Sequence, residues 1–172
     1  MKLSKPQIFG LFVLALFAVH YLFFRAPSEA QMIAKFHQRK AEFKQIRLML
    51  GQDRNVETIG SDWVRAKYGD KNGNQPEGVD LHELPLNISP QRIALYRERL
   101  RALGFSRVDS YNGGVQLPEF GGGFTDTTWG IGYMWSAKPL NPLVKSAYSQ
   151  MPKRDHWHYS YIEGNWYLYH RR

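Results

Sequence analysis

The chain has 172 residues, with 23 Lys and Arg against 15 Asp and Glu, and it contains no Cys. Its length suits one ordinary domain, and the lack of Cys excludes a disulfide scaffold, a zinc–thiolate site, an iron–sulfur cluster and a cysteine nucleophile. A hydrophobic content of 43% and an aromatic content of 15% exclude wholesale disorder. The net charge of +8 indicates a nucleic acid, an anionic membrane or an acidic partner, without choosing among them.

Residues 8–24 form an apolar run without a formal charge, after a short basic tail at residues 1–7. At 1.5 Å per residue the run covers roughly 25 Å of a ~30 Å hydrocarbon core. Lys5 and Arg25 flank it and can reach the headgroups. A cleaved signal peptide, cut after Ala30, is the alternative, but the run exceeds the usual ~7–15 apolar residues. We therefore predict a single-pass transmembrane signal anchor in the inner or plasma membrane, in contact with lipid.

The orientation of this anchor depends on its flanks. Basic residues that follow the span within the next 20 positions favour a cytoplasmic C-terminal domain by the positive-inside rule. However, only Arg25 lies directly beside the span, and a short basic tail before an apolar run is typical of an anchor whose domain lies outside. We expect an extracytoplasmic domain, which is periplasmic if the host is Gram-negative.

A basic amphipathic helix is predicted directly after the span, at residues 25–51. Phe36, Phe43 and Leu50 recur at heptad spacing, and Met32 and Ile46 occupy the neighbouring row. The rest of this helix carries a membrane-proximal basic set of Lys35, Arg39, Lys40, Lys44 and Arg47. Most of the excess positive charge therefore lies in or beside the first 51 residues, where anionic lipid or an acidic envelope partner could meet it.

The remaining chain, residues 52–172, reads as a single domain that folds together with residues 27–51. In chain order the patterns predict a short helix at 53–68, a helix at 90–103, strands at 105–111, 115–117 and 127–135, a short helix at 141–151 and a hairpin at 156–170. Ser89-Pro90 and Gly104 are the start and stop signals of the 90–103 helix. The predicted fold class is α+β, in which a transmembrane helix precedes amphipathic helices packed on a curved antiparallel sheet of meanders and hairpins.

The C-terminal hairpin has two possible registers. With a two-residue turn, Trp157, Tyr159 and Tyr161 share a face with Trp166 and Leu168, which we expect to be the core face. A three-residue turn would move the second strand's set to the opposite face. The aromatic side chains also suggest a binding surface, for which the candidates are Tyr133, Trp135, Tyr167 and Tyr169.

The candidates for chemistry are few. His156 and His158 place two imidazoles on one face of a strand, as a metal site requires, and His170 or Asp126 could join them. A calcium-type loop that begins at Asp70 lacks its Gly and its final Glu, because Gln75 and Leu81 occupy those positions. No nucleophile, base or phosphate loop is assembled, so the sequence implies no catalytic residue and no cofactor.

These observations favour a membrane-anchored, extracytoplasmic protein of the cell envelope that binds a protein partner and is not an enzyme. Nucleic acid is not an expected partner, because the span separates the protein from it and no recognition motif is present. The alternatives are a metal-dependent enzyme that uses His156 and His158, a structural membrane component, and an immunity-type or lysis-regulating inhibitor. The sequence leaves the oligomeric state open.

Overall fold

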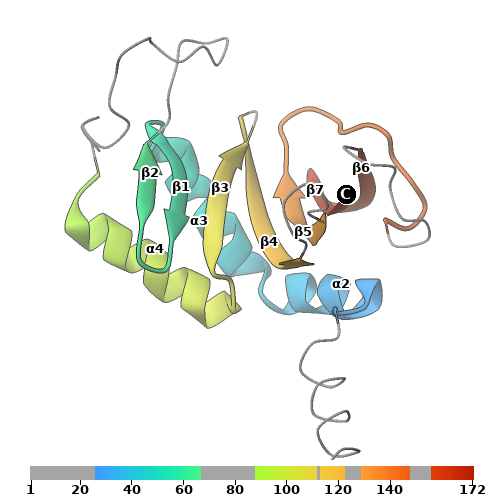
Figure 1. Ribbon diagram of the computed structural model, residues 1–172, viewed down its shortest axis with the longest axis horizontal. Coiled ribbons are helices and arrows are strands. Elements are labelled where there is room, and N and C mark those ends of the chain that lie inside the picture. Colours follow the sequence, from blue (N-terminus) through green and yellow to red (C-terminus); the bar gives the residue numbers. More distant parts are fainter. Residues whose placement is uncertain (1–25, 67–87, 112, 123–128, 148–155) are drawn as a thin grey trace, which may run out of the picture.

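A computed structural model of the chain describes residues 26–66, 88–111, 113–122, 129–147 and 156–172. Seven strands form one antiparallel sheet, and three helices pack on one of its faces, so the predicted α+β class is confirmed (Figure 1). Within these described ranges, no helix has the length and apolar character needed to cross a membrane. The predicted anchor at residues 8–24 lies outside them.

The sheet has the strand order β2-β1-β3-β4-β5-β7-β6. β3, β4 and β5 form a meander, and a long connection separates β5 from the β6–β7 hairpin, whose second strand pairs with β5. The strands are β1 (Val56–Gly60), β2 (Val64–Ala66), β3 (Arg107–Tyr111), β4 (Gly114–Gly122), β5 (Trp129–Trp135), β6 (Trp157–Glu163) and β7 (Trp166–Arg171). The predicted meander and hairpin are therefore present, and β4 is longer than its sequence pattern indicated.

The predicted helix at residues 25–51 is divided into α2 (Glu29–Gln38) and α3 (Lys40–Gln52). Arg39 separates them, with φ −120° and ψ 23°. Ser28 begins α2 through a capping box, because its hydroxyl accepts from the Gln31 backbone while the Gln31 side chain accepts from the Ser28 backbone. The predicted apolar stripe is confirmed despite the break, since Met32, Phe36, Phe43, Ile46 and Leu50 are all buried.

The helix predicted at 53–68 is wrong over residues 53–66, the part that the structure describes, because β1 and β2 form a hairpin there. Val56, Ile59 and Val64 have β-branched side chains, which suit a pleated strand better than a short helix. Ile59 pairs with Val64 across the turn and is fully buried. The spacing of these apolar residues fits a helical turn equally well, and only the pairing of β1 with β3 decides between the two structures.

The predicted helix at 90–103 is confirmed as α4 (Pro90–Leu103). Ser89 caps it by accepting from the Arg92 backbone, and Pro90 stands at its first position. Gly104 ends it in the left-handed conformation with φ 74°, and the Phe105 amide donates to the Leu100 carbonyl at 2.8 Å. The local start and stop signals were sufficient here.

The helix predicted at 141–151 is wrong over residues 141–147, the part that the structure describes. This segment runs beside β6, where the Val144 amide donates to Tyr159 O at 2.8 Å and the Tyr159 amide donates to Pro142 O at 3.2 Å. Leu143 therefore forms an isolated parallel bridge with Tyr159. The segment satisfies backbone groups at one edge of the sheet, which a helix could not do.

The β6–β7 hairpin closes through the two-residue turn Gly164-Asn165, and both residues have positive φ, of 53° and 69°. Its register nevertheless differs from the one predicted for such a turn. A bulge between Tyr161 and Glu163 adds one residue to β6, so Tyr161 pairs with Tyr167 and not with Leu168. This shift places Trp166 and Leu168 on the helix-covered face and leaves Tyr161 on the other, where it is 57% exposed.

The strands from β3 to β6 roll up on the face away from the helices. The ring of Tyr111, at the end of β3, stacks on Trp157, at the start of β6, with centroids 5.4 Å apart although four strand-to-strand steps separate them in the sheet. A second small core lies within this roll and consists of Met134, Tyr159, Tyr167 and Tyr169. The main core, between the helices and the sheet, is built around Phe36, Phe43 and Tyr133.

Candidate functional site

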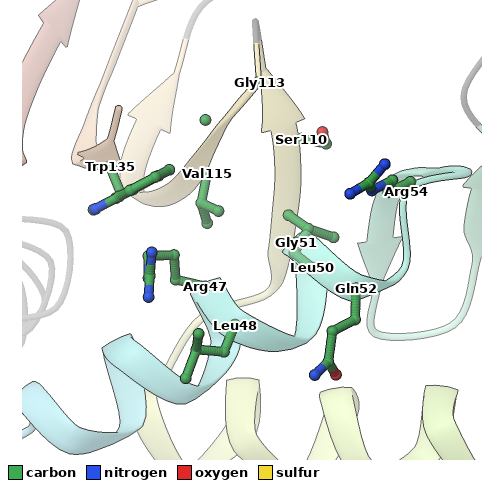
Figure 2. A pocket seen from close by; sticks show the side chains of 11 residues that line it. Arg47, Leu48, Leu50, Gly51, Gln52, Arg54, Ser110, Gly113, Val115 and Trp135 are labelled. Atoms are coloured by element: carbon green, nitrogen blue, oxygen red, sulfur yellow. The ribbon is translucent and has the colours of Figure 1, made fainter. Parts of the chain in front are cut away.

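A groove of about 570 Å³ lies between the C-terminal part of α3 and the β3–β4 hairpin (Figure 2). This volume is within the range of ligand-binding clefts, about 300–1,000 Å³. α3 provides one wall and the end of β5 provides Trp135. The groove is lined by Arg47, Leu48, Leu50, Gly51, Gln52, Arg54, Ser110, Gly113, Gly114, Val115 and Trp135.

The charged side chains that are described in the lining of this groove are all positive. Arg47 and Arg54 line it, and no Asp or Glu is among the described residues of its lining. Figure 2 shows Arg47 beside Trp135 at one side of the groove and Arg54 at the other. The Arg47 guanidinium lies 4.7 Å from the centre of the Trp135 ring. Among the described residues, neither arginine forms an ion pair, so both guanidinium groups are available to an anion that enters the groove.

The groove also offers an apolar contact. Leu48 stands on the exposed side of α3 and is 46% exposed, although the apolar stripe of the same helix is buried. Gly113 and Gly114 form the hairpin side, where a side chain at Gly114 would meet Trp135 O at 2.3 Å. The bare backbone at this position therefore lets β4 approach β5 closely and keeps the groove open.

A polar network holds the end of α3, beside the groove. The Asp53 carboxylate accepts from Arg92 Nε at 2.9 Å and from the Tyr96 hydroxyl at 2.8 Å. Arg92 also donates to Gln52 Oε1, at 2.8 Å. Burial, aided by the Asp53 carboxylate, raises the pKa of the Tyr96 phenol far above its ordinary value, so this hydroxyl remains a donor. The network holds the α3 end, and with it Arg54, against α4.

The five basic residues predicted to be membrane-proximal have different environments. Lys35 is half-buried, where it donates to both Glu119 carboxylate oxygens at 2.7 and 2.8 Å and lies 4.3 Å above the Phe105 ring. Arg39 pairs with Glu42, and Lys40 pairs with Glu163. Lys44 is exposed, and Arg47 lines the groove. Among the described residues, Lys44 and Arg47 are the members of this set that form no ion pair, and the pairs of Arg39 and Lys40 are solvent-exposed.

The predicted aromatic surface does not form, because three of its four residues are buried. Tyr133 faces the helices, contacts Phe43 and donates its hydroxyl to Met32 O at 2.9 Å. Tyr167 and Tyr169 belong to the second core, which the bulge in β6 and the roll of the sheet enclose. Trp135 alone is partly exposed, and it lines the groove.

The histidine candidates do not assemble a metal centre in the described residues, where no group of three His, Cys, Asp or Glu side chains could hold an ion. His156 precedes β6, and His158 lies in it opposite His170 of β7. His170 is buried, and its Nδ1 lies 3.2 Å from Ala147 O. Burial is the main cause that lowers the pKa of His170, and the nearby His158 lowers it further. Asp126 lies outside the described residues.

Sequence reasoning missed Arg54, Ser110 and the glycines of the β3–β4 turn as parts of a site. Arg54 carried no signal, since it falls in a segment that resembled a helix, and the groove exists only because α3 crosses the hairpin. Trp135 and Arg47 were both singled out, but as members of two separate surfaces. No known protein family, curated protein or solved structure matches the chain.

Proposed function

We propose that this protein is a membrane-anchored binding protein of the cell envelope, whose extracytoplasmic domain captures an acidic peptide segment of a partner protein. The observation that carries the proposal is the groove between α3 and the β3–β4 hairpin, in which Arg47 and Arg54 face no carboxylate of the described residues. An acidic side chain of the partner would pair with each arginine, and an apolar side chain would cover Leu48.

The internal ion pairs support this assignment. Glu119 engages the half-buried Lys35 within the fold, and Lys40 pairs with Glu163 at the surface, whereas Arg47 and Arg54 form no ion pair with a described residue. Arg47 is pre-positioned on the Trp135 ring, which reduces the entropy lost when it binds. Arginine on an aromatic side chain is typical of the residues that dominate binding energy at protein interfaces.

The location of the groove agrees with the proposed anchor. The first described helix, α2, lies at the bottom of Figure 1, whereas the end of β3 that leads to β4 lies at the top. With residues 8–24 in the membrane, a groove beside that end of β3 would face the aqueous phase. A reporter fused after Arg172 tests the orientation, and activity in the cytoplasm alone would contradict an extracytoplasmic domain.

A site-specific crosslinker tests the groove. A photoreactive residue replaces Leu48 in the full-length protein in its membrane, and a second variant carries it at the exposed Lys138, away from the groove. We expect the Leu48 position to crosslink to an acidic segment of one protein, and this product to disappear in the R47Q/R54Q variant. Crosslinks to lipid alone, or the same product from both positions, would overturn the proposal.

A further inference from the structure

A second cavity, of about 380 Å³, is lined by residues of β3, β4, β5 and β7. It shares no lining residue with the groove between α3 and the β3–β4 hairpin. It lies at the mouth of the roll, where β4 ends and β5 begins. Arg107 of β3 and Arg171 of β7 reach it from two strands, and its further lining includes Tyr169, Phe120, Gly121, Trp129 and Gly130.

Glycine residues of β5 make room for this arrangement. A Cβ atom at Gly132 would lie 2.8 Å from Tyr169 Cε1, so the tyrosine ring crosses β5 where a side chain would otherwise stand. A Cβ atom at Gly130 would lie 3.7 Å from Arg171 Nε. Gly130 pairs with Gly121, and the floor between the two arginines is therefore bare backbone.

Each of the two guanidinium groups has a described contact, but their charge is only partly compensated within the described residues. Arg107 Nε donates to Asp109 Oδ2 at 3.1 Å, and Glu119, the lining carboxylate, is engaged by Lys35. Arg171 lies 5.5 Å from the centre of the Trp157 ring and forms no ion pair with a described residue. One guanidinium charge at the cavity is therefore left over for an anion from outside.

The Tyr169 hydroxyl lies in the field of both arginines. Burial raises its pKa to about 12, although Arg171, Arg107 and a hydrogen bond with Gln116 oppose the shift. The phenol is therefore protonated at neutral pH and can donate a hydrogen bond. Beside it, the Phe120 and Trp129 rings lie 5.5 Å apart and present an apolar wall.

We propose that this cavity binds a small organic oxyanion, a carboxylate or phosphate ester, whose charged group is held by Arg171, Arg107 and Tyr169. The apolar part of the ligand lies against Phe120 and Trp129. Planar guanidinium groups suit the geometry of either oxyanion. The site is independent of the groove proposed for the protein partner.

Calorimetric titration of the full-length protein in detergent tests this site, with phenyl phosphate as the probe. We expect phenyl phosphate to bind at least about tenfold more tightly than phenol, which lacks the charge, and more tightly than inorganic phosphate, which lacks the ring. Equal affinities for phenyl phosphate and phenol, or no binding of phenyl phosphate, would refute an oxyanion site.

Variants localise the site. R171Q should weaken phenyl phosphate binding about ten- to hundredfold, and R171K should recover part of this loss, because Lys keeps the charge without the planar fork. R101Q is the matched control, since Arg101 is exposed on α4 outside this cavity and should bind as the unchanged protein does. The R47Q/R54Q variant should also bind phenyl phosphate normally. Unchanged affinity in R171Q, or a loss in R47Q/R54Q equal to that in R171Q, would show that the ligand binds elsewhere.

Discussion

The close approach of β4, β5 and Tyr169 at Gly132 gives the sharpest test of the rolled sheet. In the Gly132→Ala variant, the new Cβ would lie 2.4 Å from Leu117 O and 2.9 Å from the Tyr169 hydroxyl oxygen. Overpacking of a well-filled interior costs about 1–3 kcal/mol. The upper end applies here, because one of the two obstacles is the backbone of a paired strand, which cannot move without disturbing the ladder. We therefore expect a loss of about 3 kcal/mol in the free energy of unfolding.

Urea unfolding of the full-length protein in mild detergent, followed by tryptophan fluorescence, measures this loss. Gly51→Ala is the matched control, because nothing lies within 4 Å of its Cβ position and Gly51 stands inside α3. This second change should stabilise the protein by about 0.5–1 kcal/mol through helix propensity. At about 2–4 °C per kcal/mol, the two melting temperatures should move in opposite directions, with the larger shift for Gly132→Ala. A Gly132→Ala protein within about 0.5 kcal/mol of the unchanged one would refute the close packing of Tyr169 on β5.

Three further predictions concern polar groups in the fold. Asp53→Ala should lower the free energy of unfolding, measured by urea titration, by about 1–3 kcal/mol, because it leaves the buried Tyr96 hydroxyl without its acceptor. Tyr96→Phe should lower it by only about 1 kcal/mol. Equal losses in the two variants would contradict this role of Asp53. Because the pKa of His170 is lowered in the fold, the unfolded chain binds more protons than the folded one just below pH 6.5, and stability should fall as the pH drops through this region. In urea titrations at pH 7.5 and pH 5, His170→Gln should show a smaller fall. An unchanged pH dependence would exclude His170 as its source. After dialysis against excess zinc and then buffer, the purified protein should keep less than one equivalent of zinc, measured by elemental analysis. If it keeps one full equivalent, and the His158→Ala variant loses it, the metal-enzyme alternative is supported.

The sequence predicted correctly those elements whose structure depends on interactions between residues close together in the chain. The cap at Ser89 and the left-handed Gly104 act within one turn of the helix ends, so α4 could be placed from its own residues. The apolar stripe from Met32 to Leu50 was equally readable, because burial follows the helical period on both sides of the break at Arg39. The break itself left no signal in the sequence.

Elements decided by distant pairing could not be predicted. β1 is a strand because it pairs with β3, although the long segment between β2 and the end of α4 separates the two strands in the sequence. The faces of the final hairpin depend on one extra residue in β6, and neither turn chemistry nor alternation reveals that bulge. The same bulge affects the predicted aromatic surface, since Tyr167 and Tyr169 lie in the second core and do not form the exposed patch that the sequence suggested.

The ion pairs of the fold show which basic residues account for the positive charge that a partner could meet. The sequence places a basic set on one predicted helix, which suggests a single surface for an anionic partner. In the fold, Lys35 and Lys40 form ion pairs with Glu119 and Glu163, which lie far along the chain. The fold leaves Arg47 in the groove and brings Arg54 to the same place, although Arg54 is outside the basic set. The proposed binding chemistry therefore depends on the cations that form no ion pair with a described residue, and net charge alone could not have located them.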